Sequence, residues 1–209
     1  MYQCSDCRFC AIANGNYKYL SVDRPVYSNS RFYAIASIGA LLEGWSLVVP
    51  KYHFLSMKSC YQDRLFIDAV NVMLSRLSQQ FGKPVIAFEH GANHNESSTA
   101  CGTAHAHLHL VPFHGSLEQR IKDNRDWTEC SFNEIFKEAG SYEYLYYNDI
   151  SKCNEWTKQK GLLHILKSPT SQFFRKILAE ACGKIDFADY KIYPFLDVAS
   201  KTRKALLSS

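Results

Sequence analysis

Apolar residues follow regular patterns along the first half of the chain, and these patterns predict its elements. Alternation over residues 25–36 and an apolar run over 46–49 predict two strands. Between residues 62 and 81, apolar side chains return every three or four positions, which predicts an amphipathic helix. A short apolar run at 84–88 predicts a buried strand, and the polar stretch 91–102 predicts a loop.

The segment that follows this loop, AHAHLHLVP at residues 104–112, holds three histidines at two-residue spacing. We expect a strand here. Because side chains alternate between the faces of a strand, His105, His107 and His109 would share one face while Leu108 and Leu110 pack against a core. Three buried imidazoles without a role would be costly, whereas histidine suits proton transfer, nucleophilic attack and metal ligation. The run therefore predicts a functional site.

Composition limits the classes of protein to which the chain can belong. With 209 residues, 46% of them hydrophobic, it can bury a core as one domain, or as one domain with an elaborated tail. The net charge of +4 is small and suits a phosphate-bearing ligand, but gives no strong evidence for nucleic-acid binding. No stretch has the length of a membrane span, and the first residues lack the pattern of a signal peptide. We therefore expect a cytoplasmic protein without a membrane partner.

The eight cysteines must then be explained in a reducing compartment. Cys4, Cys7 and Cys10 lie within seven residues, a spacing more typical of metal ligation than of a disulfide framework. Cys7 and Cys10 form a Cys-x-x-Cys pair, which structural zinc sites combine with a distant second pair. Cys4 and Cys7 have the same spacing, so a contribution from Cys4 stays open.

Three segments together resemble the histidine-triad (HIT) superfamily: CRFCAIANG at 7–15, GWSLVVPKYH at 44–53, and the histidine run. The resemblance covers roughly residues 7–113 and is closest to zinc-containing members and the galactose-1-phosphate uridylyltransferase branch. It implies an α+β fold, a bent antiparallel sheet with packed helices. Residues 1–114 would form the HIT domain with an N-terminal zinc-binding segment. Residues 115–209 would form a C-terminal helical extension on the same core, with helices expected at 131–139 and 170–182.

The resemblance also implies an activity, nucleotidyl hydrolysis or transfer through attack on the α-phosphate of a nucleotide conjugate. His107 would be the nucleophile and form a covalent nucleotidyl-histidine. The carbonyl of His105 would set the tautomer of His107, and His109 and Thr103 would donate to phosphate oxygens. No catalytic cofactor is expected. The other residues that the resemblance assigns to phosphate or nucleotide binding are Glu89, His90, Gln172 and Arg175.

For the metal, the resemblance implies that His53 and His105 complete a structural zinc site with Cys7 and Cys10. Such a site would tie the N-terminal segment to the histidine run. Trp45 stands where a histidine is common in the family, a departure that we interpret as catalytically silent.

Two other functions stay open at this point. The histidine cluster could itself be the catalytic zinc site of a hydrolase, helped by Glu89 or His90, although the outer two histidines of an ideal strand lie about 13 Å apart. Alternatively, the chain could be a non-catalytic nucleotide- or RNA-binding HIT module. Cys101-Gly102-Thr103 replaces the Gly-Gln-Ser/Thr of many relatives and keeps that interpretation open. A homodimer, the leaving group, the base and the role of the extension are also undecided by the sequence.

Overall fold

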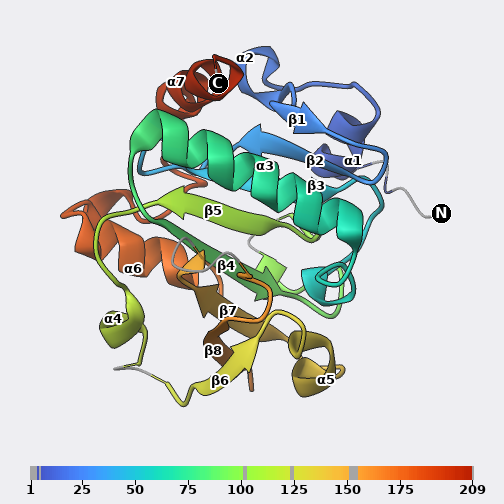
Figure 1. The fold of residues 1–209 in the computed structure, drawn as a ribbon, viewed down its shortest axis with the longest axis vertical. Coiled ribbons are helices and arrows are strands. Elements are labelled where there is room, and N and C mark those ends of the chain that lie inside the picture. The colour runs from blue at the N-terminus through green and yellow to red at the C-terminus, as the bar shows by residue number, and fades with distance from the viewer. Residues whose placement is uncertain (1–3, 5, 101–102, 123–124, 151–154, 209) are drawn as a thin grey trace.

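Strands from both halves of the chain join in one sheet, in the order β1-β2-β3-β5-β4-β7-β8-β6 (Figure 1). The computed structural model describes residues 4, 6–100, 103–122, 125–150 and 155–208. Every neighbouring pair of strands is antiparallel. The strands are β1 Tyr27–Ser28, β2 Phe32–Ala36, β3 Ser46–Pro50, β4 Val85–Gly91, β5 Leu108–Pro112, β6 Thr128–Ser131, β7 Tyr144–Asn148 and β8 Lys160–Ile165. The helices are α1 Arg8–Ala13, α2 Leu20–Asp23, α3 Arg64–Phe81, α4 Glu118–Lys122, α5 Ile135–Ala139, α6 Phe173–Ala181 and α7 Leu196–Leu207.

The long helix α3 confirms the prediction from periodicity and lies across one face of the sheet (Figure 1). The Asp63 side chain accepts a hydrogen bond from the Leu65 amide and so caps the first turn. Gly82 ends the helix in the left-handed conformation, at φ 59°, which glycine adopts without steric cost. The apolar side of the helix packs on the sheet and builds the first hydrophobic core.

A second core fills the opposite face of the sheet, where α1 and α6 contribute buried side chains. Successive side chains of the histidine run face the two cores in turn, as the alternation in the sequence predicts. Leu108 and Leu110 are buried on the α3 side. On the other side His109 stacks on Phe88, a residue of the second core, with ring centroids 4.4 Å apart. The functional face of the run is therefore the face covered by α1 and α6.

The strand is shorter than the sequence predicts, because β5 begins only at Leu108. Before that point the backbone bonds to loops and not to a neighbouring strand: the Ala106 amide donates to the carbonyl of Phe54 at 2.6 Å. His105 and His107 therefore lie in the entry to β5, where the chain can turn their rings toward different partners.

The described residues after position 114 continue the same sheet, since β7 pairs with β4 along 87–91. The two expected helices appear, in shorter form, as α5 and α6. The extension also contains three strands, β6, β7 and β8, that the expectation of a helical extension did not include. All five residues of β7 are buried, so this strand has no alternation of polar and apolar positions from which it could be recognised.

Within the described part of the chain, no helix combines the length and hydropathy needed to cross a membrane.

Candidate functional site

Most of the predicted site residues line one cavity on the face of the sheet that carries the histidines. Its walls come from α1, the loop after β2, strands β3, β4 and β5, and the start of α6. The predicted residues that line it are His90, Thr103, His107, His109, Gln172 and Arg175. Cys101 and Gly102, which precede Thr103, lie outside the described residues.

His107 is held in a defined tautomer. Its Nδ1 lies 2.8 Å from the carbonyl oxygen of His105. A carbonyl can only accept, so Nδ1 carries the proton and donates, and the lone pair of the neutral ring is on Nε2. Burial lowers the pKa of His107, which favours this neutral form. The ring thus presents an unprotonated nitrogen at the cavity.

His109 is held in the opposite tautomer by Trp45. The indole Nε1 lies 2.9 Å from His109 Nδ1, and an indole N–H can only donate. His109 Nδ1 must therefore accept, and the proton of the neutral ring is on Nε2. Burial, followed by the charges of His107, His90 and Arg175, lowers the pKa of His109 well below its usual value. Of the histidines that line the cavity, His107 thus presents an acceptor and His109 a donor.

Sequence reasoning missed the contribution of Trp45. The preceding Gly44 has φ 89°, and a Cβ at that position would lie 2.5 Å from the ring of Pro112. Trp45 follows this close turn and lies two residues before Leu47, the β3 residue that pairs with His109. Only the strand register brings the two rings together, and the sequence contains no signal of that register.

His105 turns its side chain away from the cavity and toward α1. Its Nε2 donates to the carbonyl of Pro50 at 2.8 Å, which leaves the lone pair on Nδ1. That nitrogen lies 3.3 Å from the Cys7 sulfur and 3.6 Å from the Cys10 sulfur. Burial lowers the pKa of His105 to about 3, so the ring is neutral. His105 therefore contributes its backbone carbonyl to His107 and its side chain to a separate cluster.

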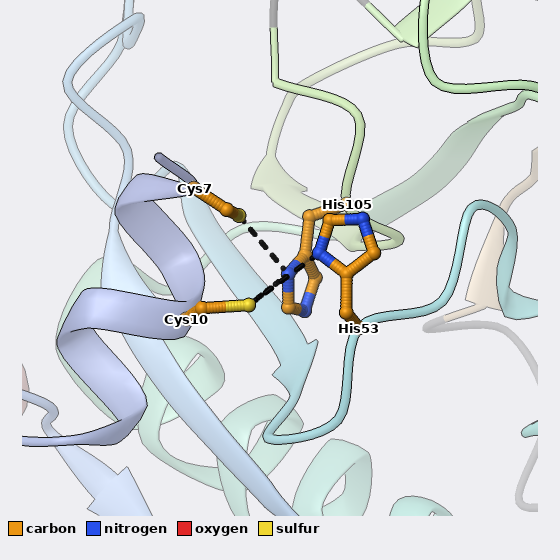
Figure 2. Close-up of side chains that lie close together, drawn as sticks. All are labelled: Cys7, Cys10, His53 and His105. Carbon is orange, nitrogen blue, oxygen red and sulfur yellow. Dashed lines mark hydrogen bonds between the residues drawn. The ribbon is translucent and has the colours of Figure 1, made fainter. Parts of the chain in front are cut away.

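Figure 2 shows this cluster, in which Cys7, Cys10, His53 and His105 point toward one another. Cys7 and Cys10 belong to the N-terminus of α1, and His53 follows β3. The four ligand atoms lie within 4.8 Å of one another, and His53 Nδ1 is 3.4 Å from the Cys10 sulfur. It is the one such group of potential ligands among the described residues, and Cys4 is outside it.

The cluster fits a tetrahedral zinc ion. Zinc–sulfur bonds of about 2.3 Å and zinc–nitrogen bonds of about 2.0–2.1 Å place tetrahedral sulfur and nitrogen ligands about 3.6 Å apart. Three of the four sulfur–nitrogen distances here are 3.3, 3.4 and 3.6 Å. Burial also raises the pKa of the Cys7 thiol to about 11, so a thiolate at this position needs a neighbouring cation. The Pro50 carbonyl is the kind of partner that fixes the tautomer of a metal-ligating histidine.

Glu89 does not line the cavity, which corrects its assignment to phosphate or nucleotide binding. Side chains alternate along β4, so His90 faces the cavity and Glu89 faces the α3 core. Glu89 is buried and accepts hydrogen bonds from the Met57 amide at 2.5 Å, from Tyr144 at 2.6 Å and from Tyr61. Desolvation raises its pKa to about 7 despite these donors.

This buried carboxyl should make stability depend on pH. The folded state holds the Glu89 proton more tightly than an unfolded glutamate with a pKa near 4.5, so its stabilising contribution is lost as pH rises toward 7. Glu89→Gln mimics the protonated form. The unfolding free energy of the wild type relative to Glu89→Gln is therefore expected to fall by roughly 2–3 kcal/mol between pH 5 and pH 8. Urea denaturation of both proteins measures it, and a difference that does not change with pH would contradict the expectation.

Gln172 and Arg175, at the start of α6, are both buried next to the cavity. The Gln172 side chain donates to Asp189 and accepts from the Tyr190 amide, each at 3.0 Å. Its amide therefore holds the segment before α7 against α6. Arg175 holds the same segment through the carbonyls of Phe187 and Ala188.

Comparisons with known proteins returned structures only. No model of a known protein family matches the chain, and no curated protein is significantly similar to it in sequence. A Hit-like protein from Bartonella henselae is 18% identical, with a TM-score of 0.43 over 56% of this chain and 84% of its own. A histidine triad nucleotide-binding protein from Sulfolobus tokodaii is 16% identical, with a TM-score of 0.42 over 97% and 93%. A zinc-bound histidine triad protein from Mycobacterium smegmatis is 23% identical, with a TM-score of 0.36 over 53% and 77%. These three solved structures are all described as Hit-like or histidine-triad proteins.

Proposed function

We propose that the protein is a nucleotidyl hydrolase or transferase that attacks the α-phosphate of a nucleotide conjugate through His107. The observation that carries the proposal is the pair of opposite tautomers at the cavity. The His105 carbonyl leaves His107 Nε2 as a neutral nucleophile, and Trp45 leaves His109 Nε2–H as a donor. A phosphate group needs both: a nucleophile at phosphorus and donors at its oxygens.

The proposed reaction has two displacements. The lone pair of His107 Nε2 forms a bond to the α-phosphorus, and the bond to the leaving oxygen breaks with its electron pair on that oxygen. Water or another hydroxyl compound then attacks the phosphorus, the P–N bond breaks with its electron pair returning to Nε2, and the proton of the acceptor is released. His109 and the Thr103 hydroxyl line the cavity and would donate to the phosphate oxygens as charge on them increases.

Zinc has a separate, structural role in this proposal. Cys7, Cys10, His53 and His105 would hold the ion and fix α1 to the entry of β5. The ion would thereby hold the His105 backbone, whose carbonyl orients His107. This structural role for zinc disfavours a catalytic zinc ion bound by the three histidines of the run. The Trp45 hydrogen bond occupies one nitrogen of His109 and leaves a proton on the other, and Glu89 faces the opposite core.

Hydrolysis in H₂¹⁸O tests the site of attack. With a conjugate that joins a nucleoside monophosphate to a second phosphate, we expect one ¹⁸O in the nucleoside monophosphate product and none in the other product. Mass spectrometry of the two products measures this label. Label in the second phosphate would place the attack away from the α-phosphorus and contradict the proposal.

Trp45→Phe is expected to lower kcat roughly tenfold, because the variant loses the hydrogen bond that selects the donor tautomer of His109. Steady-state kinetics measures this effect, with KM expected to change less than kcat. Trp156→Phe is the matched control, since it also loses an indole hydrogen bond, to Asn71, but in the α3 core. Equal losses of kcat in the two variants would show that Trp45 acts only through packing.

A further inference from the structure

We propose that Arg175 forms a second anion subsite next to the triad, so that the substrate carries a phosphate group on its leaving group as well as at the attacked position. This inference rests on the proposed function and names its substrate class: nucleoside 5′-diphosphates and their conjugates.

The cavity carries positive charge without compensating carboxylates. Arg8 and Arg175 both line it, and no acidic residue does so among the described residues. The two guanidinium groups differ in their partners. Arg8 forms an ion pair with the fully buried Asp23, which neutralises much of its charge. No acidic side chain within the described part of the chain forms an ion pair with Arg175. Burial lowers the pKa of Arg175 to about 10, and the charge of nearby Asp189 offsets only part of this effect.

The Arg175 guanidinium is oriented by its backbone partners. Nε donates to the Ala188 carbonyl at 2.8 Å, and Nη2 donates to the Phe187 carbonyl at 2.9 Å. Nη1 is buried and has no hydrogen-bond partner among the described residues, although the side chain is only 4% exposed. A buried charged donor without an acceptor is costly, so this nitrogen is suited to an anionic acceptor from a ligand. The two carbonyl contacts hold the guanidinium plane in place before that ligand arrives.

Gly39 lies beside this nitrogen in the lining of the cavity, together with Tyr190. A Cβ at Gly39 would lie 3.6 Å from Arg175 Nη1 and 3.3 Å from the Cβ of Tyr190. A larger residue at position 39 would therefore crowd the guanidinium at the cavity.

The position of Arg175 relative to the triad separates it from the attacked phosphate. The ring of Phe9, which follows Arg8, lies 5.2 Å from the ring of His107, whereas the ring of Phe174, which precedes Arg175, lies 4.9 Å from Phe88, the ring that stacks on His109. The two cations thus lie toward different ends of the histidine pair. A phosphate on His107 and His109 would have Arg175 beyond His109, where an adjoining second phosphate can reach it.

Such a contact would assist the bond cleavage. When the bond between the α-phosphorus and the bridging oxygen breaks, the electron pair stays on that oxygen and adds negative charge to the departing phosphate. A guanidinium stabilises this charge without transferring a proton. An amine or sugar hydroxyl as leaving group gains nothing from the same contact.

Binding measured without turnover tests the subsite directly. In zinc-loaded His107→Ala protein, isothermal titration calorimetry compares the monophosphates and diphosphates of adenosine, guanosine, cytidine and uridine at fixed ionic strength. We expect the diphosphate of the preferred base to bind at least about tenfold more tightly than its monophosphate. Adding Arg175→Gln should remove most of this preference, so that diphosphate and monophosphate bind within about threefold of each other, because a charge-assisted hydrogen bond is lost.

Two further variants separate charge from structure. Lys176→Gln removes the same charge from the next, exposed residue of α6 and should keep the preference. Arg175→Lys disturbs the two carbonyl contacts but keeps the charge, so its preference should exceed that of Arg175→Gln. The subsite is overturned if the protein binds diphosphates no better than monophosphates, if Arg175→Gln keeps the preference, or if Arg175→Lys loses it equally. Because His107 is absent throughout, these results are independent of whether a covalent intermediate forms.

Discussion

Replacing His107 with alanine is expected to lower nucleotidyl turnover by at least about a thousandfold, because His107 is the one group among the described cavity residues whose unprotonated nitrogen is oriented by a backbone carbonyl. Stability should change by no more than about 1 kcal/mol, because the ring is only partly buried and its loss exposes no ion pair. Nucleotide binding should persist, since the donors at His109 and Thr103 remain. Steady-state kinetics and calorimetric binding measure the two effects.

His114→Ala is the matched control for this prediction. His114 follows the same strand but is exposed and does not line the cavity. Its replacement should leave kcat and KM unchanged. Turnover by His107→Ala within tenfold of the wild type, in a protein that is folded, would remove His107 from the role of nucleophile.

Loss of zinc should destabilise the protein by a measurable amount. At free zinc about a hundredfold above its Kd, binding to the folded state alone contributes about 2.7 kcal/mol. For a chain of this size, removal of the ion should therefore lower Tm by roughly 5–10 °C. Differential scanning calorimetry of zinc-loaded and chelated protein measures this shift. The double variant Cys7→Ser and Cys10→Ser should show a low Tm that does not respond to zinc.

Cys182→Ala supplies the control for the cysteine variants. Cys182 follows α6, is partly exposed and lies outside the four-residue cluster. This variant should keep the zinc-dependent rise of Tm. A rise of the same size in the Cys7 and Cys10 double variant would show that zinc binds at another position.

The first half of the fold could be predicted because its patterns are local. Helix α3 follows from three- and four-residue spacing, and its start at Asp63 and end at Gly82 have ordinary capping chemistry. The strands β6–β8 could not be predicted in this way. Their residues pair with strands that are distant in sequence. Because β7 is buried on both faces, its sequence has no polar–apolar alternation, and only its position in the sheet identifies it as a strand.

The metal cluster was predictable for a similar reason. Cys7 and Cys10 are close in sequence, and the motif resemblance supplied His53 and His105; the structure brings the four together. Residues whose environment depends on sheet register were not predictable. Glu89 was assigned to phosphate or nucleotide binding but bonds to Met57 and Tyr144 in the α3 core, and Trp45 was interpreted as catalytically silent but bonds to His109.

Intact-protein mass spectrometry tests the central proposal most directly. Zinc-loaded wild type and zinc-loaded His107→Ala are mixed briefly with a pooled set of nucleotide conjugates and quenched without acid because a phosphorus–nitrogen bond is acid-labile. We predict a mass increase of one nucleoside monophosphate on the wild type and none on His107→Ala. An equal adduct on His107→Ala, or substrate consumption by the wild type that leaves no adduct at any quench time, would contradict covalent catalysis by His107.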